Sequence, residues 1–202
     1  SKEQHSKEFL KVCREADCHK QRLEPYSQWG NAAEINIREL KRASARKMMS
    51  TNSPKKLWDH SLELEAIVRS HTAHDHFGLD GEVPETLMTG RPGDISHICE
   101  YSWYQWVMYY ESDWKYPNPQ WQLGRYLGPA VDVGSMMTAK ILMANGQYLP
   151  RTTYRRLTIE EENSPTHIEQ RRVFTELVNN NLGDPCVADD FPEEYLPPEH
   201  EQ

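Results

Sequence analysis

The acidic residue with the clearest setting for chemistry is Glu34, near the start of the stretch AAEINIRELKR. Apolar residues recur here at helical spacing, which predicts a helix from about Ala32 to Met49. Arg38 and Lys41 follow Glu34 by four and seven residues, so a helix places all three on one face. Carboxylate oxygens can hold Mg²⁺, and cationic side chains can meet phosphates. This face is therefore a candidate site for nucleic-acid chemistry.

A purely structural interpretation of the same residues is also open. Acidic residues are common at helix starts because the helix dipole stabilises their charge. A row of basic side chains can be a solvated face, opposite a buried side that we expect to contain Ala33, Ile37, Leu40, Ser44 and Met48. Residue types and spacing do not decide between the two interpretations.

Residue types that bind zinc form two groups, which are Cys13, Cys18 and His19, and then His71, His74 and His76. Neither group has the Cys-x-x-Cys spacing of a closed structural zinc site. We therefore expect a thiol on a packed helix and a solvated histidine loop. The sequence also has no glycine-rich phosphate-binding loop and no serine nucleophile elbow.

Charge is distributed unevenly along the 202 residues, whose formal net charge is -8. Residues 182–202 contain seven acidic and no basic residues, whereas residues 38–56 contain seven basic residues and one acid. A basic patch can therefore coexist with an acidic chain. We expect the acidic tail to be disordered, because its composition offers little apolar surface to bury.

Elsewhere the pattern predicts helices first and strands later. A second helix is expected over KKLWDHSLELEAIVRS and a short one around PETLMTG. Runs rich in aromatic and β-branched residues between 101 and 158, with Asn145-Gly146 between two of them, predict a small antiparallel β-domain. One further helix is expected after Thr158.

Several segments of the sequence resemble those of the copia-type retrotransposon integrases, a family of retroviral-type integrases. The similarity is carried by SQWGNAAEINIRELKR, LWDHSLELEAIVRS and HFGLDGEVPETLMTGRPGDISH, in that order. QLGRYLGP and GQYLPRTTYRRLT resemble the family's segment after the catalytic core. The resemblance covers residues 1–158 and implies three parts: the C-terminal portion of an RNase H-like core (1–100), a small β-barrel-like domain (101–158), and a helix with an acidic tail (159–202).

The resemblance implies a role for each site residue. In the family, two Asp and one Glu hold two Mg²⁺ ions for hydrolysis and strand transfer of DNA ends, and two such ions stabilise both the attacking and the leaving oxygen. Glu34 matches the catalytic, metal-binding Glu. The residues expected to contact DNA are Arg38, Lys41, Arg42 and Lys47. DNA is the expected partner, and the full-length parent is expected to be a homo-oligomer that uses Mg²⁺.

Departures from the family limit the activity expected of this chain. Neither catalytic Asp is present, Gln28 replaces a usual Pro, and the loop before Glu34 is about one residue short. We expect a truncated integrase without activity of its own. The alternative is a non-catalytic nucleic-acid-binding or assembly module, in which aromatic residues stack on bases beside basic ones (Trp103, Trp106 and Tyr126 with Arg125 and Arg151), unless these form ordinary core.

Apolar runs, the N-terminal segment and the cysteines bear on the expected compartment. There is no apolar run of membrane-spanning length, and SKEQHSKEFL does not resemble a signal peptide. Four unevenly spaced cysteines are typical of a reducing compartment. The expectation is an intracellular protein, nuclear or cytoplasmic, without a membrane partner.

Overall fold

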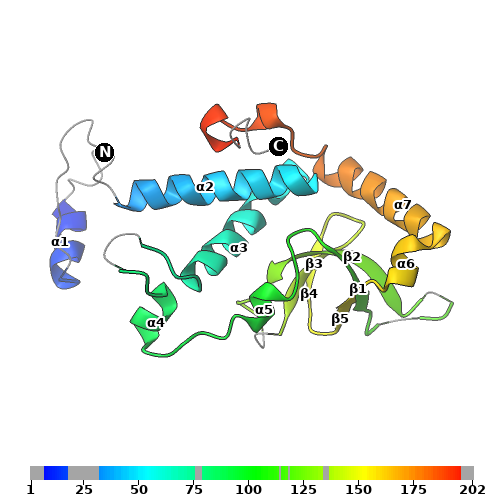
Figure 1. Ribbon diagram of the computed structural model, residues 1–202, viewed down its shortest axis with the longest axis horizontal. Coiled ribbons are helices and arrows are strands. Elements are labelled where there is room, and N and C mark those ends of the chain that lie inside the picture. Colours follow the sequence, from blue (N-terminus) through cyan, green and yellow to red (C-terminus); the bar gives the residue numbers. More distant parts are fainter. Residues whose placement is uncertain are drawn as a thin grey trace. The chain divides into compact units, whose positions relative to one another are not determined.

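The structure, a computed structural model, describes residues 7–17, 32–75, 79–113, 115–117, 119–133 and 137–196. Contacts divide the chain into two compact units, residues 1–38 and 39–202. The first unit contains helix α1 (Lys7–Glu15) and the first turns of helix α2 (Ala32–Thr51). The second contains the rest of α2 and all the elements that follow (Figure 1).

The helices before the sheet begin and end close to where the sequence predicts. After α2 come the 3₁₀ helix η3 (Lys55–Leu57), α3 (Trp58–Ser70), α4 (Pro84–Thr89) and α5 (Ser96–Cys99). In α4, proline occupies the first turn, where its missing N–H costs nothing, and Gly90 ends the helix with a φ of 70°.

The buried side of α2 is shorter than the sequence predicts. Ser44 and Met48 are buried and Leu40 is half-buried, but Ala33 and Ile37 are exposed. The prediction was wrong for these last two because helical spacing identifies a face of the helix and not the length over which a neighbour covers it.

The sheet has five antiparallel strands in the order β4-β3-β2-β1-β5. The strands are β1 (Trp106–Tyr110), β2 (Trp121–Pro129), β3 (Ala139–Leu142), β4 (Tyr148–Arg151) and β5 (Tyr154–Arg156). The predicted hairpin at Asn145-Gly146 joins β3 to β4, with a Gly146 φ of 80°. Both the antiparallel sheet and the mixed α and β class are confirmed.

The sheet is strongly curled, as its connectivity requires. β4 and β5 are its opposite edges, yet only residues 152 and 153 separate them in the chain. In a flat sheet these edges would be about 19 Å apart, whereas three Cα steps span at most about 11 Å. Gly124 lies in β2 where strands approach closely, since a Cβ atom there would lie 2.5 Å from Ile141 Cγ2.

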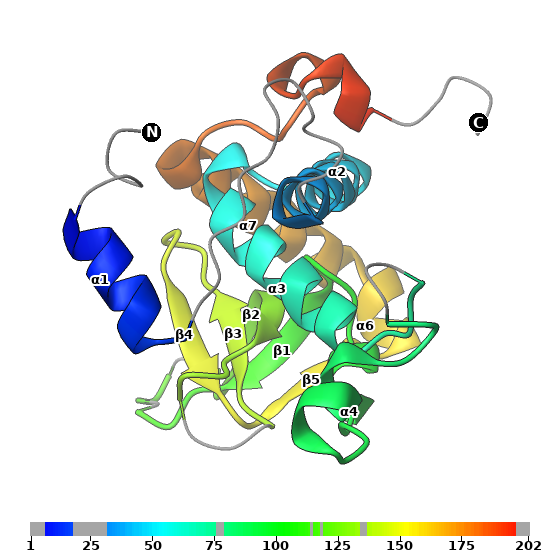
Figure 2. The ribbon, with the colours of Figure 1, turned by 90° about the vertical axis from the view of Figure 1, so that its left-hand side faces the viewer.

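Two helices and two short turns follow the sheet. Helix α6 (Ile159–Asn163) begins at a capping box in which Thr158 and Glu161 bond to each other's backbone N–H. Helix α7 (Pro165–Leu182) follows, and the chain continues through 3₁₀ turns η4 (Ala188–Asp190) and η5 (Glu193–Tyr195). Figure 2 shows α3 and α7 on the same side of the sheet.

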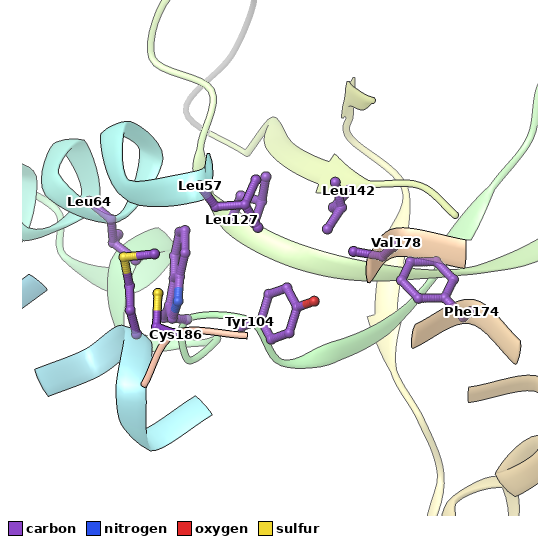
Figure 3. Close-up of a cluster of buried hydrophobic side chains, with 10 residues drawn as sticks. Leu57, Leu64, Tyr104, Leu127, Leu142, Phe174, Val178 and Cys186 are labelled. Carbon is purple, nitrogen blue, oxygen red and sulfur yellow. The ribbon is translucent and has the colours of Figure 1, made fainter. Parts of the chain in front are cut away.

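One hydrophobic cluster joins helices from before and after the sheet to the sheet itself (Figure 3). Its buried members come from α2, η3, α3, the sheet and its approach, α7 and the tail: Met48, Leu57, Leu64, Trp103, Tyr104, Leu127, Leu142, Phe174, Val178 and Cys186. Residues 39–202 form one compact unit, and this cluster includes residues from both sides of the expected boundaries at 100/101 and 158/159. The division of the chain at these boundaries stays a prediction.

The tail is not disordered over residues 183–196, so that prediction was wrong there. Cys186 is 4% exposed and its backbone N–H donates to the Ser53 carbonyl at 3.0 Å. Pro185 forms an isolated β-bridge with Pro54. The prediction considered only the composition of the tail itself. The tail is ordered because it packs on a surface formed by α2 and η3. Residues 197–202 lie outside the described residues.

The RNase H-like core stays a prediction. Every strand of the described residues lies between Trp106 and Arg156, within the part expected to follow that core. In the described parts of residues 1–100 the chain is helical or irregular, apart from the bridge at Pro54.

Candidate nucleic-acid interface

Glu34 lies in the first turn of α2, and its side chain is exposed. This position suits a carboxylate whether or not it binds a metal, because the helix dipole favours negative charge there. Among the described residues, no group of three or more His, Cys, Asp or Glu could hold a metal ion. The metal-binding role of Glu34 therefore stays a prediction.

The four predicted DNA-contacting residues have different surroundings. Arg38 and Lys41 are exposed. Arg42 is half-buried: its Nε donates to the Glu194 carbonyl at 2.9 Å and its Nη1 to Glu39 Oε1 at 3.2 Å. Arg42 is thus partly covered by the C-terminal segment.

Lys47 turns toward α3. Its Nζ lies 2.8 Å from Glu65 Oε2, and the two side chains are only 20% and 16% exposed. Glu65 therefore balances the charge of Lys47 inside the protein. Of the predicted set, Arg38 and Lys41 are the cations that face solvent most openly.

Two basic residues missing from the predicted set also lie at this surface. Arg46 Nη2 donates to the Leu196 carbonyl at 3.4 Å, and Lys55 Nζ lies 2.8 Å from Asp190 Oδ1. The charge count over residues 38–56 contained both, but neither falls on the face set by Glu34. Arg46 and Lys55 belong with Arg42 because all three contact the tail.

The aromatic residues proposed for base stacking are core residues in two of three cases. Trp103 is 5% exposed and Tyr126 is fully buried. Trp103 Nε1 donates to Ser53 Oγ at 3.3 Å. Neither ring offers a face to a base, so the core interpretation is confirmed for both.

The third ring, Trp106, stacks with the half-buried Arg125. The Arg125 guanidinium carbon lies 3.4 Å from the centroid of Trp106 and 4.3 Å from that of Tyr104. Arg125 Nη1 also donates to the Tyr104 carbonyl at 2.6 Å. Burial lowers the pKa of Arg125 to about 10. Trp106 is partly buried and packs against the core cluster, so this cation–π stack lies at the edge of the core.

The structure describes only part of the cysteine and histidine groups. Cys13, Cys99 and Cys186 are free thiols, while Cys18, His19 and His76 lie outside the described residues. His71 and His97 line a mostly apolar cavity of about 510 Å³ between α3 and the end of β2. His71 Nδ1 lies 2.9 Å from the carbonyl oxygen of Ile67, in the last turn of α3 just before it.

Comparisons of this chain with protein-family models, with curated proteins and with solved structures found no match. In the part of the chain that the structure describes, no helix is both long enough and apolar enough to cross a membrane.

Proposed function

We propose that this chain is the C-terminal part of a copia-type integrase, a polynucleotidyl transferase, and that it contributes DNA-binding surface. The observation that carries the proposal is the order and spacing of motifs, in which AAEINIRELKR precedes LDG, P-E, TG and D-I-S-H. The exposed cations of α2, Arg38 and Lys41, support DNA as the partner.

No catalytic step is assigned to the chain by itself. Two Mg²⁺ ions would stabilise the attacking and leaving oxygens in the parent enzyme, and they need converging carboxylates. Glu34 is one such ligand by resemblance, and the described residues do not provide the others. In this proposal the missing Asp ligands belong to the full-length parent, which acts on retroelement DNA ends as a homo-oligomer.

A second candidate is a non-catalytic nucleic-acid-binding or assembly module. The observation that favours it is the common core of residues 39–202, in which α2 and α3 pack on the sheet and α7. Met48 of α2 and Leu64 of α3 are buried within the unit itself. Such a unit can carry a binding surface without any catalytic partner.

DNA binding is tested by fluorescence anisotropy with short duplex ends over a range of salt concentrations. The Arg38→Ala, Lys41→Ala double variant should bind more weakly and lose nearly two units of slope in log K against log salt, about 0.9 for each phosphate contact. Glu34→Gln should bind equally or more tightly, since it removes a negative charge near phosphate. The matched control is Arg91→Ala, Lys115→Ala, which removes the same charge from exposed positions outside α2. Equal effects of both double variants would overturn the proposed surface.

Strand transfer tests the lack of catalysis that both candidates predict for this chain. We expect no product from labelled DNA ends with Mg²⁺ or Mn²⁺, because one carboxylate cannot bind two ions in catalytic geometry. Reproducible strand transfer that is lost in Glu34→Gln would contradict this expectation. An open reading frame upstream of Ser1 that supplies an Asp would support the integrase parent over the standalone module.

A further inference from the structure

The acidic C-terminal segment lies along the basic part of α2. In both Figure 1 and Figure 2 the red turns η4 and η5 lie beside this helix, on the side away from the sheet. Three cations bond to the segment: Arg42 to the Glu194 carbonyl at 2.9 Å, Arg46 to the Leu196 carbonyl at 3.4 Å, and Lys55 to Asp190 at 2.8 Å. These contacts span residues 190–196.

The segment has two parts with different surroundings. Residues 183–187 form an anchor, in which Cys186 is buried in the core and Pro185 pairs with Pro54. Residues 188–196, which we call the cover, bond to the three cations, and within it Phe191 also packs against the core cluster. The anchor and Phe191 therefore contribute to the fold, whereas the carbonyls of Glu194 and Leu196 beyond Phe191 bond to arginines at the surface.

Three acidic side chains of the cover, those of Asp189, Glu193 and Glu194, are exposed. They add negative charge to a surface on which one N–H group of Arg42 and one of Arg46 donate to backbone carbonyls of the cover. A phosphate backbone approaching either arginine would have to compete with that carbonyl and would meet like charge.

We infer that the cover is an internal competitor for polyanions, which nucleic acid must displace to reach Arg42, Arg46 and Lys55. The inference rests on the proposed function, since it concerns regulation of the same basic helix. Competition within one chain is effective because the tether holds the cover at a high local concentration. Arg38 and Lys41 remain exposed, so the chain binds DNA weakly with the cover in place and more strongly without it.

Two variants remove the competitor in different ways. In the first, Asp189→Asn, Glu193→Gln and Glu194→Gln neutralise the exposed acids. The three bonds to Arg42, Arg46 and Lys55 are kept, because they use two backbone carbonyls and Asp190. In the second, the chain ends at Phe191, which retains Cys186 and Asp190 but deletes the carbonyls that bind Arg42 and Arg46. The matched control, Glu82→Gln, Glu160→Gln and Glu162→Gln, makes the same change in net charge at exposed positions elsewhere.

Anisotropy with the same DNA duplex, and thermal unfolding of each variant, measure the effect. The neutralised variant should bind roughly tenfold more tightly at low salt, and the control should change much less. The chain ending at Phe191 should steepen the salt dependence by about 0.9 for each arginine released. Arg42→Ala should weaken binding more in that shortened chain than in the full chain. Melting temperatures close to the parent would show that the fold is retained.

The outcomes separate the inference from the proposed function. If the parent chain and all variants bind DNA with equal affinity and slope, the cover does not compete, while DNA binding stands. If only the variants with altered tails bind more tightly, the inference is supported. If no variant binds DNA even at low salt, the proposed function fails and the inference with it.

Discussion

Lys55 Nζ lies 2.8 Å from Asp190 Oδ1, which connects the 3₁₀ helix after α2 to a tail residue 135 positions later in the chain. The bond from Lys55 lowers the pKa of Asp190, and the same bond raises that of Lys55. Lys55 is exposed, so this pair adds little to stability. The burial of Cys186 and the packing of Phe191 against the same core also hold the tail.

The reactivity of Cys186 tests this docking. Burial raises the pKa of its thiol, which leaves less thiolate to react, whereas Cys99 is exposed. In a variant that keeps Cys186 as its single cysteine, we expect modification by a thiol reagent only on unfolding. The matched variant that keeps only Cys99 should react rapidly in the folded state. Equal rates would show that the tail is not docked.

The common core predicts that α7 and the sheet unfold together. Phe174 is 5% exposed in the cluster that contains Leu127 and Leu142, so Phe174→Ala should cost about 3–5 kcal/mol. Val173→Ala, next to it and 41% exposed, should cost much less. Thermal melts followed by far- and near-ultraviolet circular dichroism should show one transition. A sheet that melts unchanged in Phe174→Ala would restore the idea of an independent domain 101–158.

Gly124 should be intolerant of a side chain. A Cβ atom there would lie 2.5 Å from Ile141 Cγ2 and 3.1 Å from Tyr109 Cδ1, so Gly124→Ala should destabilise the protein by about 1–3 kcal/mol. Removing the clashing methyl group with Ile141→Ala should absorb part of this cost. In a double-mutant cycle measured by urea unfolding, the double variant should lose less than the sum of the two single variants. Simple additivity would contradict the close contact.

Glu161 should make stability fall in acid. Hydrogen bonds from Arg155, at 2.7 Å to each carboxylate oxygen, and from the backbone of Thr158 lower the pKa of Glu161 to about 2. An unfolded Glu titrates near about 4.3, so the folded protein binds fewer protons and its stabilisation is present above that value. It is lost as the pH falls from about 4.3 to about 2. Glu161→Gln should reduce the change of melting temperature with pH in this window. Glu160→Gln is the neighbouring control. An unchanged pH profile would mean that the pair does not form.

The sequence predicted the local elements well, because their causes are local. Helical spacing of apolar residues indicated α2 and α3, and the Asn145-Gly146 turn indicated the hairpin between β3 and β4. The separation of basic residues 38–56 from the acidic tail is also a property of the sequence alone. What the resemblance implies about Glu34, Mg²⁺ and DNA integration remains a proposal.

Only the tertiary structure decided which cations face solvent and what the tail does. Lys47 follows Arg42 by five residues in an equally basic stretch, yet it pairs with Glu65 of α3, while Arg42 bonds to Glu194. Each outcome depends on partners 18 and 152 residues away in the chain, and helical spacing carries no information about them. In the same way, Cys186 orders a tail of disorder-prone composition because a buried site formed by other segments accepts it. Burial is a property of the assembled surfaces, and for this reason it could not be read from the segment alone.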